Sequence, residues 1–199
     1  MMGRGFSRRM LAAAAGVVLL LAACSEQKSV APPPAFEMTK DATGYYCGMG
    51  LMEHKGPKGQ IILESKPQEP LWFTSVRDTV AFTLLPEEPK DIAAIYVSDM
   101  GKAGSWDDPG AKNWTDARTA AFVIGGDATG GMGAPEAVPF SDKTAAAAFA
   151  EQHGGKIVGF NDIPKDYVLG SVPAMPADGG HGGAMPGMTA EPPAAATHN

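Results

Sequence analysis

Two stretches of ten residues decide the fold: FTSVRDTVAF at 73–82 and FSDKTAAAAF at 140–149. Each begins and ends with phenylalanine, and the second follows the first at an offset of 67 residues. In each, an extended apolar segment runs into a hydroxyl or acidic side chain of the kind that caps a helix by accepting a backbone N–H. We therefore expect a strand leading into a helix at both places.

The segments around these stretches repeat as well. A Gly-Met-Gly triplet lies at 48–50 and again at 131–133. The pattern predicts an α+β fold of two small pseudo-repeated ββαβ halves, over 45–104 and 105–170, with chance similarity in a Gly- and Ala-rich chain as the alternative. The expected strands are 45–52, 60–64 with 70–74, 92–98, 120–125, 136–140 and 156–160, and the expected helices are 75–84 and 142–153.

The N-terminus has the pattern of an export signal. Three arginines precede a short apolar run over 11–21, and small residues lead to Cys24. This predicts a signal peptide over 1–23, too short to span a membrane, followed by lipidation of Cys24. Cleavage of an ordinary signal peptide near Ala23 is the alternative, and both the general secretory and the twin-arginine export routes remain open.

Two further segments have compositions that do not favour a packed core. Residues 24–44 are Pro-rich and predict a lipid-anchored tether. Residues 171–199 are rich in Gly, Pro, Ala, Met and His and predict a disordered tail. The tail is interpreted either as a loose copper-capturing segment or as inert, and its candidate ligands are His181, Met185, Met188 and His198.

Charge and cysteine content narrow the function classes. The chain of 199 residues has a net charge of −6, which argues against a nucleic-acid partner. There are two cysteines. With Cys24 lipidated, no disulfide framework is possible, and Cys47 is a lone thiol outside the cytoplasm that needs a function.

The densest group of candidate soft metal ligands begins at Cys47. In an extended strand, Cys47 and Met49 would point to one face, and thiolate with thioether selects Cu(I) above harder ions. Pseudo-symmetry could bring Met132 toward them, and His54 is either a nitrogen ligand or an exposed turn residue. Met52 would face the core. Cys47 and Met49 as ordinary buried side chains is the alternative.

Three function classes follow from these residues. A metallochaperone would hold Cu(I) through Cys47, and a structural lipoprotein would dock to a membrane complex without using the thiol. A thiol enzyme would need a base for Cys47, for which His54 is the one candidate nearby, and the sequence has no C-x-x-C pair. The thiol enzyme has the least support, so we expect a non-enzymatic protein, with the metallochaperone and the structural lipoprotein both open from these residues alone.

Several segments together resemble one family. The run from Cys47 to His54, followed by Gly-Pro-Lys-Gly-Gln at 56–60, resembles NosL, the lipoprotein accessory factor of nitrous oxide reductase. The resemblance covers nearly all of 45–170 together with the small residues before Cys24. Further matching segments lie at 70–73, 84–87, 95–100 and 131–137.

The resemblance implies a periplasmic Cu(I)-binding lipoprotein with two ββαβ-type halves. Such proteins deliver copper for the copper-sulfide centre of nitrous oxide reductase, together with an ABC transporter and a periplasmic β-helix protein. Cys47 and Met49 match the family's copper motif, Met132 matches its second methionine motif, and His54 matches the histidine after the first motif. Ser25, after the lipidated cysteine, favours the outer over the inner membrane.

Overall fold

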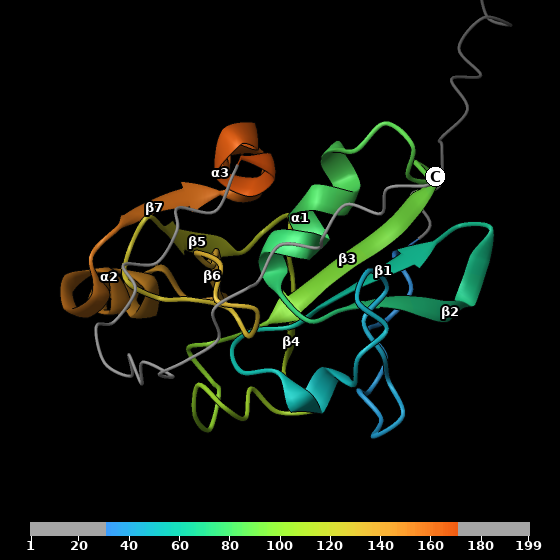
Figure 1. Cartoon of the computed structure of the whole chain (residues 1–199), viewed down its shortest axis with the longest axis horizontal. Coiled ribbons are helices and arrows are strands. Elements are labelled where there is room, and N and C mark those ends of the chain that lie inside the picture. Colours follow the sequence, from blue (N-terminus) through green and yellow to red (C-terminus); the bar gives the residue numbers. More distant parts are fainter. Residues whose placement is uncertain (1–30, 171–199) are drawn as a thin grey trace, which may run out of the picture.

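The computed structural model describes residues 31–170, which form two antiparallel sheets with helices packed against them (Figure 1). The strands are β1 (Gly59–Leu63), β2 (Lys66–Phe73), β3 (Ile92–Ser98), β4 (Trp114–Asp116), β5 (Ala121–Ile124), β6 (Val138–Phe140) and β7 (Lys156–Gly159). The helices are α1 (Val76–Leu84), α2 (Lys143–His153) and α3 (Lys165–Leu169), with short 3-10 helices η2 (Leu51–Glu53) and η3 (Phe160–Asp162).

The two halves repeat one topology. In the first sheet the order is β2-β1-β3-β4, and in the second it is β6-β5-β7, so the first strand of each half lies between its second and third. In each half a helix follows the second strand: α1 packs against β1 and β2, and α2 packs against all three strands of its sheet. The expected α+β fold of two ββαβ halves is confirmed.

The two helix starts form as the repeat predicts. Phe73 ends β2, and the Ser75 hydroxyl accepts a hydrogen bond from the backbone N–H of Asp78 at 3.0 Å. Phe140 ends β6, and the Asp142 carboxylate accepts from the N–H of Thr144 at 2.8 Å. Each cap satisfies a donor that the first turn of a helix leaves free.

One apolar core joins the two halves. Phe73 and Phe82 of the first half belong to the same buried cluster as Phe122, Ile124 and Val168 of the second. The halves therefore bury apolar surface against each other, and their relative position is set by packing rather than by a linker.

The structure corrects the strand expected over 45–52. This segment forms a turn followed by η2, and Gly48 has a φ of +66°, which does not occur in a strand. The argument that Cys47 and Met49 share a strand face is therefore wrong. Met52 is also not in the core, because 61% of its surface is exposed.

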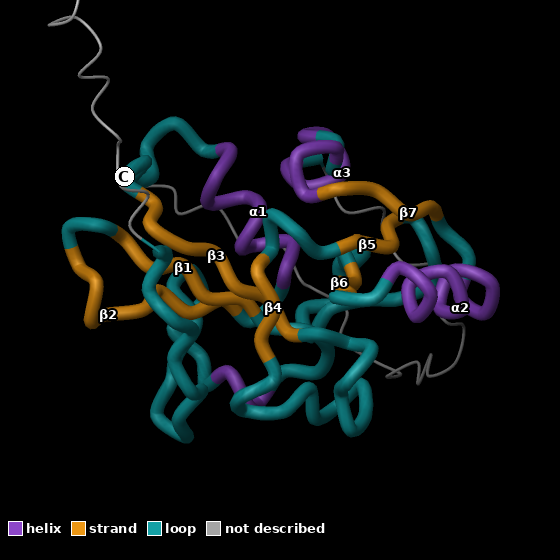
Figure 2. The backbone as a smooth tube through the Cα atoms, turned by 180° about the vertical axis from the view of Figure 1, so that it is seen from behind, coloured by secondary structure: helices purple, strands orange, loops and turns teal. Residues whose placement is uncertain are grey.

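Two elements were not expected from the sequence. β4 lies within the range assigned to the second half, yet it pairs with β3 and extends the first sheet. α3 follows β7 and packs against α1. In Figure 2, the loops gather along the lower side of the molecule, where η2 also lies.

Part of the expected tether packs against the first sheet. The side-chain amide of Gln60 bonds both the N–H and the carbonyl of Phe36, and the Tyr96 hydroxyl donates to the carbonyl of Pro33. Met38 is buried with Leu51 in a small cluster. The folded part of the chain therefore begins before residue 45.

The signal peptide, Cys24 and the four tail residues named above lie outside the described residues. Within residues 31–170, no helix is long and apolar enough to cross a membrane.

Two buried carboxylates bridge the halves. Asp99, after β3, accepts hydrogen bonds from both the backbone N–H and the hydroxyl of Ser141. Glu136, before β6, accepts from the backbone N–H of Arg77 in the first turn of α1 at 3.0 Å. Asp99 is 1% exposed and Glu136 is 2% exposed. Hydrogen bonds to buried carboxylates fix geometry, because losing the partner leaves a desolvated group unsatisfied.

Glu136 should make the free energy of unfolding fall as pH rises. Burial raises its pKa from 4.5 to about 8, against the opposing effect of hydrogen bonds from the N–H groups of Ala137 and Arg77 and the charge of Lys58. The folded state then holds a proton that the unfolded state releases between these values. We expect this group to lower the unfolding free energy as pH rises through this window, by at most about 1.4 kcal/mol per pH unit.

Urea unfolding of the chain beside Glu136→Gln from pH 4.5 to 8 measures this contribution. The Gln variant cannot ionise, so its unfolding free energy should decline less with pH. Equal slopes for the two proteins would contradict the assignment.

Candidate functional site

Cys47 lies in a tight turn over residues 44–49, here called the cysteine turn. The N–H of Gly44 donates to the carbonyl of Met49 at 2.9 Å, and the N–H of Gly48 donates to that of Gly44 at 2.8 Å. A side chain at residue 44 would place its Cβ 2.7 Å from the Cys47 sulfur, so only glycine leaves room for the thiol. The half-buried Cys47 Sγ lies 3.8 Å from the Thr74 hydroxyl oxygen.

Two tyrosines anchor the cysteine turn to the first half. The hydroxyls of Tyr45 and Tyr46 donate to the two carboxylate oxygens of Glu88, at 3.1 and 2.9 Å. Both rings pack against Phe73. Burial, and then the neighbouring Glu88, raises the pKa of both tyrosines, so they remain donors at neutral pH. The turn is therefore held at a fixed place beside α1.

Met132 lies in a loop of the second half over residues 129–135, here called the methionine loop. Thr129 and Pro135 form an isolated bridge at its base. Within it, the N–H of Gly130 donates to the carbonyl of Ala134 at 2.8 Å, and that of Gly133 donates to Gly130 at 2.8 Å. The side chain of Met132 is 58% exposed.

The cysteine turn and the methionine loop meet at one cavity of about 310 Å³. Cys47 and Met132 both line it. Its other walls include Tyr46, the N-terminal turn of α1 at Ser75 and Asp78, and Glu136. The structure thus brings together a thiol from one half and a thioether from the other, as the pseudo-symmetry suggested.

His54 lies against the methionine loop. A Cβ at Gly131 would be 2.5 Å from the Cβ of His54, so the loop backbone approaches this histidine closely. The Nε2 atom of His54 is buried and has no hydrogen-bond partner. Burial raises the pKa of Asp78 in the cavity wall, and the hydrogen bond with Ser75, Arg77 and His54 oppose this shift. His54 is therefore adjacent to the cavity rather than an isolated turn residue.

Met49 takes a different position from the one that the strand pattern predicted. It belongs to the cysteine turn and is 37% exposed, but it is not among the residues that line the cavity. A role for Met49 therefore depends on its proximity along the chain, two residues from the thiol.

Sequence reasoning did not single out Lys58 or Glu136. Lys58 is 1% exposed, and its ammonium donates to the carbonyls of His54 and Gly56 at 2.7 and 2.6 Å. Burial lowers the pKa of Lys58 to about 8, and the charge of Glu136 opposes this. The Oε2 atom of Glu136 is buried without a partner. Both residues fall within the segments that resemble the family, and this was the only signal that could have found them.

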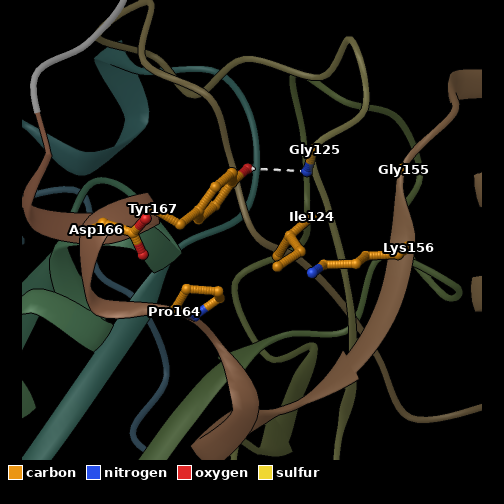
Figure 3. Close-up of a pocket in the computed structure, with 7 residues that line it drawn as sticks. All are labelled: Ile124, Gly125, Gly155, Lys156, Pro164, Asp166 and Tyr167. Carbon is orange, nitrogen blue, oxygen red and sulfur yellow. Dashed lines mark hydrogen bonds between the residues drawn. The ribbon is translucent and has the colours of Figure 1, made fainter.

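Two other cavities have different chemistry. One of about 470 Å³ lies between β5, β7 and α3, where the Tyr167 hydroxyl accepts a hydrogen bond from the N–H of Gly125 (Figure 3). Lys156 and Asp166 line it, and none of its lining residues carries a sulfur or an imidazole. Another, of about 510 Å³, is lined by Met100, by Trp106 and by His153, whose Nδ1 bonds Asp127 at 2.9 Å. Neither cavity offers a thiol.

The donors around the cavity that Cys47 and Met132 line suit a soft ion. Within residues 31–170 no group of three or more His, Cys, Asp and Glu side chains is placed to hold a metal ion. The donors beside the Cys47 thiol are the thioethers of Met49 and Met132 and the imidazole of His54. A thiolate with thioethers and one imidazole favours Cu(I) over Zn²⁺ and excludes Mg²⁺. The buried Nε2 of His54 has no hydrogen-bond partner in residues 31–170, and in the tautomer with the proton on Nδ1 it could bind a cation.

Comparison with known proteins gives a consistent result. The NosL family model matches residues 34–168. The chain is 50% identical over 134 residues to the copper-binding lipoprotein NosL of Achromobacter cycloclastes, covering 67% of this chain and 69% of that one. It is 34% identical over 119 residues to the copper-binding lipoprotein NosL of Stutzerimonas stutzeri, covering 60% of each chain.

A solved structure matches as well. The fold superposes on the crystal structure of the copper chaperone NosL from Shewanella denitrificans with a TM-score of 0.63 at 35% identity. That match covers 67% of this chain and 98% of the other. With two antiparallel sheets, a shared core and the matched residues 34–168, this chain belongs to the NosL family.

Proposed function

We propose that this chain is a Cu(I) chaperone whose primary ligands are the Cys47 thiolate and thioethers from both halves. The observation that carries the proposal is the single cavity lined by Cys47 and Met132. The relatives named above are a copper-binding lipoprotein and a copper chaperone, which supports the same function for this chain.

The ligand set follows from the donors that reach the cavity or flank it. Cys47 supplies the thiolate, Met132 supplies a thioether across the cavity, and Met49 supplies a second thioether from the same turn as the thiol. His54 Nε2 is the one nitrogen donor beside the methionine loop. Because it has no partner, binding a cation would remove the cost of an unsatisfied buried acceptor, about 1–3 kcal/mol.

The exposure of the thioethers suits transfer. Met132 is 58% exposed and Met49 is 37% exposed, so a ligand from another protein can approach the ion while Cys47 still holds it. Copper can then pass to the other protein through an intermediate in which both proteins bind it. It is never released as a free ion. A deeply buried site would need the fold to open first.

The surface around the site suits a protein partner. Of the seven large apolar side chains that are exposed within residues 31–170, five lie at 45–52 and 130–134. Clustered exposed apolar side chains are typical of interaction surfaces. The five, here called the docking face, are Tyr45, Tyr46, Met49, Met52 and Met132.

We assign the copper acceptor on the basis of the family. Its members serve nitrous oxide reductase, so the proposed destination is the copper-sulfide centre of that enzyme, reached with an ABC transporter and a periplasmic β-helix protein. Lipidated Cys24 would hold the chain at the membrane on the periplasmic side, with Ser25 favouring the outer membrane. Removal of residues 1–23 takes away three arginines and no acids, so the net charge of −6 becomes −9, which would favour docking on a basic partner surface.

The competing functions have less support. A thiol enzyme needs a base in contact with the thiol, whereas the polar neighbour of Cys47 in the described structure is the Thr74 hydroxyl. A purely structural lipoprotein gives no reason for a thiol and a thioether to line one cavity.

Replacing Cys47 tests the primary ligand. With Cys24 changed to Ser so that Cys47 is the only thiol, the chain should compete for one Cu(I) against a chromophoric Cu(I) chelator. Cys47→Ser should lose tight binding, because a hydroxyl is a hard and weak donor to Cu(I). Equal weak binding by both proteins would contradict the site.

Replacing Met132 tests whether the second half contributes a ligand. X-ray absorption of the Cu(I)-loaded chain should show mainly sulfur scatterers, and Met132→Leu should remove one of them. Met100→Leu, at a thioether that lines the cavity with Trp106 and His153, is the matched control and should leave the sulfur shell unchanged. A shell made only of nitrogen and oxygen would exclude the proposed ligand set.

Met52 tests the docking face separately from binding. Met52→Lys should leave Cu(I) affinity unchanged while slowing copper transfer to nitrous oxide reductase in the presence of its maturation complex. Ile157→Lys, at an exposed apolar residue of β7 far along the chain from both loops, is the control and should transfer normally. Equal rates for both variants and the parent would remove Met52 from the docking face.

A further inference from the structure

Glu136 occupies an unusual position between the two halves. It belongs to the second half, yet its Oε1 accepts the N–H of Arg77 at 3.0 Å in the first turn of α1. Ser75 of the first half caps the neighbouring N–H of Asp78. The N-terminus of α1 is thus capped by one side chain from each half, and each cap satisfies a backbone N–H that the first turn of the helix leaves free.

The methionine loop rests directly on the same carboxyl group. A Cβ at Gly130 would lie 2.7 Å from Glu136 Oε2 and 3.6 Å from the Cβ of Ser75. The loop backbone therefore packs against both caps of α1. The backbone of Glu136 is fixed as well, because its N–H donates to the carbonyl of Ala128 at 3.0 Å and its carbonyl accepts from the Tyr167 hydroxyl at 2.8 Å.

The first half contains the counterpart of this group. Buried Lys58 donates to the carbonyls of His54 and Gly56. A buried polar side chain on each side of the boundary thus fixes one of the two segments that carry His54 and Met132. Such groups favour one arrangement of the chain, because a buried group that loses its hydrogen-bond partner is left unsatisfied.

We infer that Glu136 is a positioning residue that holds the methionine loop over Cys47, so that Met132 can join the copper site. The inference deepens the proposed function and rests on it for the copper ligands. Glu136 supplies no metal bond, because its Oε1 is used by backbone N–H groups and a carboxylate is a poor donor to Cu(I). Its effect on copper passes through the loop that it supports.

The structure supplies a matched control in Asp99. Asp99 is also a buried carboxylate that links the two halves, through Ser141, but it does not line the cavity. Asp99→Asn and Glu136→Ala should both lower the midpoint of urea unfolding. Only Glu136→Ala should change the reactivity of Cys47 and the binding of Cu(I). Glu136→Gln should match the parent in both, because the amide oxygen can still accept from the N–H of Arg77.

The first readout needs no copper. In the chain with Cys24→Ser, Cys47 is the only thiol, and its rate of alkylation by iodoacetamide reports how well the methionine loop covers it. Glu136→Ala should react severalfold faster than the parent, while Glu136→Gln and Asp99→Asn should react at the parent rate. An unchanged rate in Glu136→Ala, or an equal increase in Asp99→Asn, would overturn the inference.

The second readout uses the Cu(I)-loaded chain. Glu136→Ala should lose one sulfur scatterer, as Met132→Leu does, and bind Cu(I) about 10- to 100-fold more weakly, the usual effect of losing a residue that orients a ligand. A full sulfur shell in Glu136→Ala would overturn the inference. Where Glu136→Ala does not fold, Glu136→Leu fills the same space without an acceptor. Failure of the copper proposal itself would appear as Cys47-independent binding, and the alkylation rates would still decide the role of Glu136.

Discussion

The close contact between the two halves is the constraint on which the proposed site depends. The cysteine turn belongs to one half and carries Cys47 and Met49, and the methionine loop belongs to the other and carries Met132. The approach of the methionine loop to His54 of the first half requires glycine at residue 131, because any side chain there would collide with His54. The shared core fixes the distance between the halves, so the cavity is a consequence of packing and not of local loop geometry.

The secondary structure away from the site followed from local patterns. Each of the two stretches that begin and end with phenylalanine specifies a strand end, a helix N-cap and an amphipathic helix within ten residues. These signals act over short distances along the chain. The repeat then predicted the two halves. A short edge strand such as β4 was missed because its three residues carry no periodicity, and its pairing with β3 is a long-range contact.

The local structure at the site was harder to predict. The repeated order of elements suggested a strand over 45–52, but glycine at positions 44 and 48 allows a tight turn, with φ of +66° at Gly48. Lys58 and Glu136 lie among Gly and Pro residues, a setting typical of solvated turns. Their burial depends on long-range contacts, such as that of Glu136 with Arg77 of the other half, which no local pattern encodes. The donor types at Cys47 and Met132 could be identified from the sequence, whereas the buried groups that support them could not.

The chemistry of the site divides between soft exposed groups and hard buried ones. Thioethers keep their donor ability without a charge, so Met132 can lie in solvent at low cost and still meet an incoming ligand. The hydrogen-bonding groups that fix the loops, Lys58 and Glu136, are almost fully buried, where their hydrogen bonds are not weakened by water. A transfer site needs both properties, because ligands must be reachable while their positions stay fixed. If the thioethers were buried and the hydrogen-bonding groups exposed, the ion would be inaccessible to an incoming ligand. The loops that carry its ligands would also be mobile.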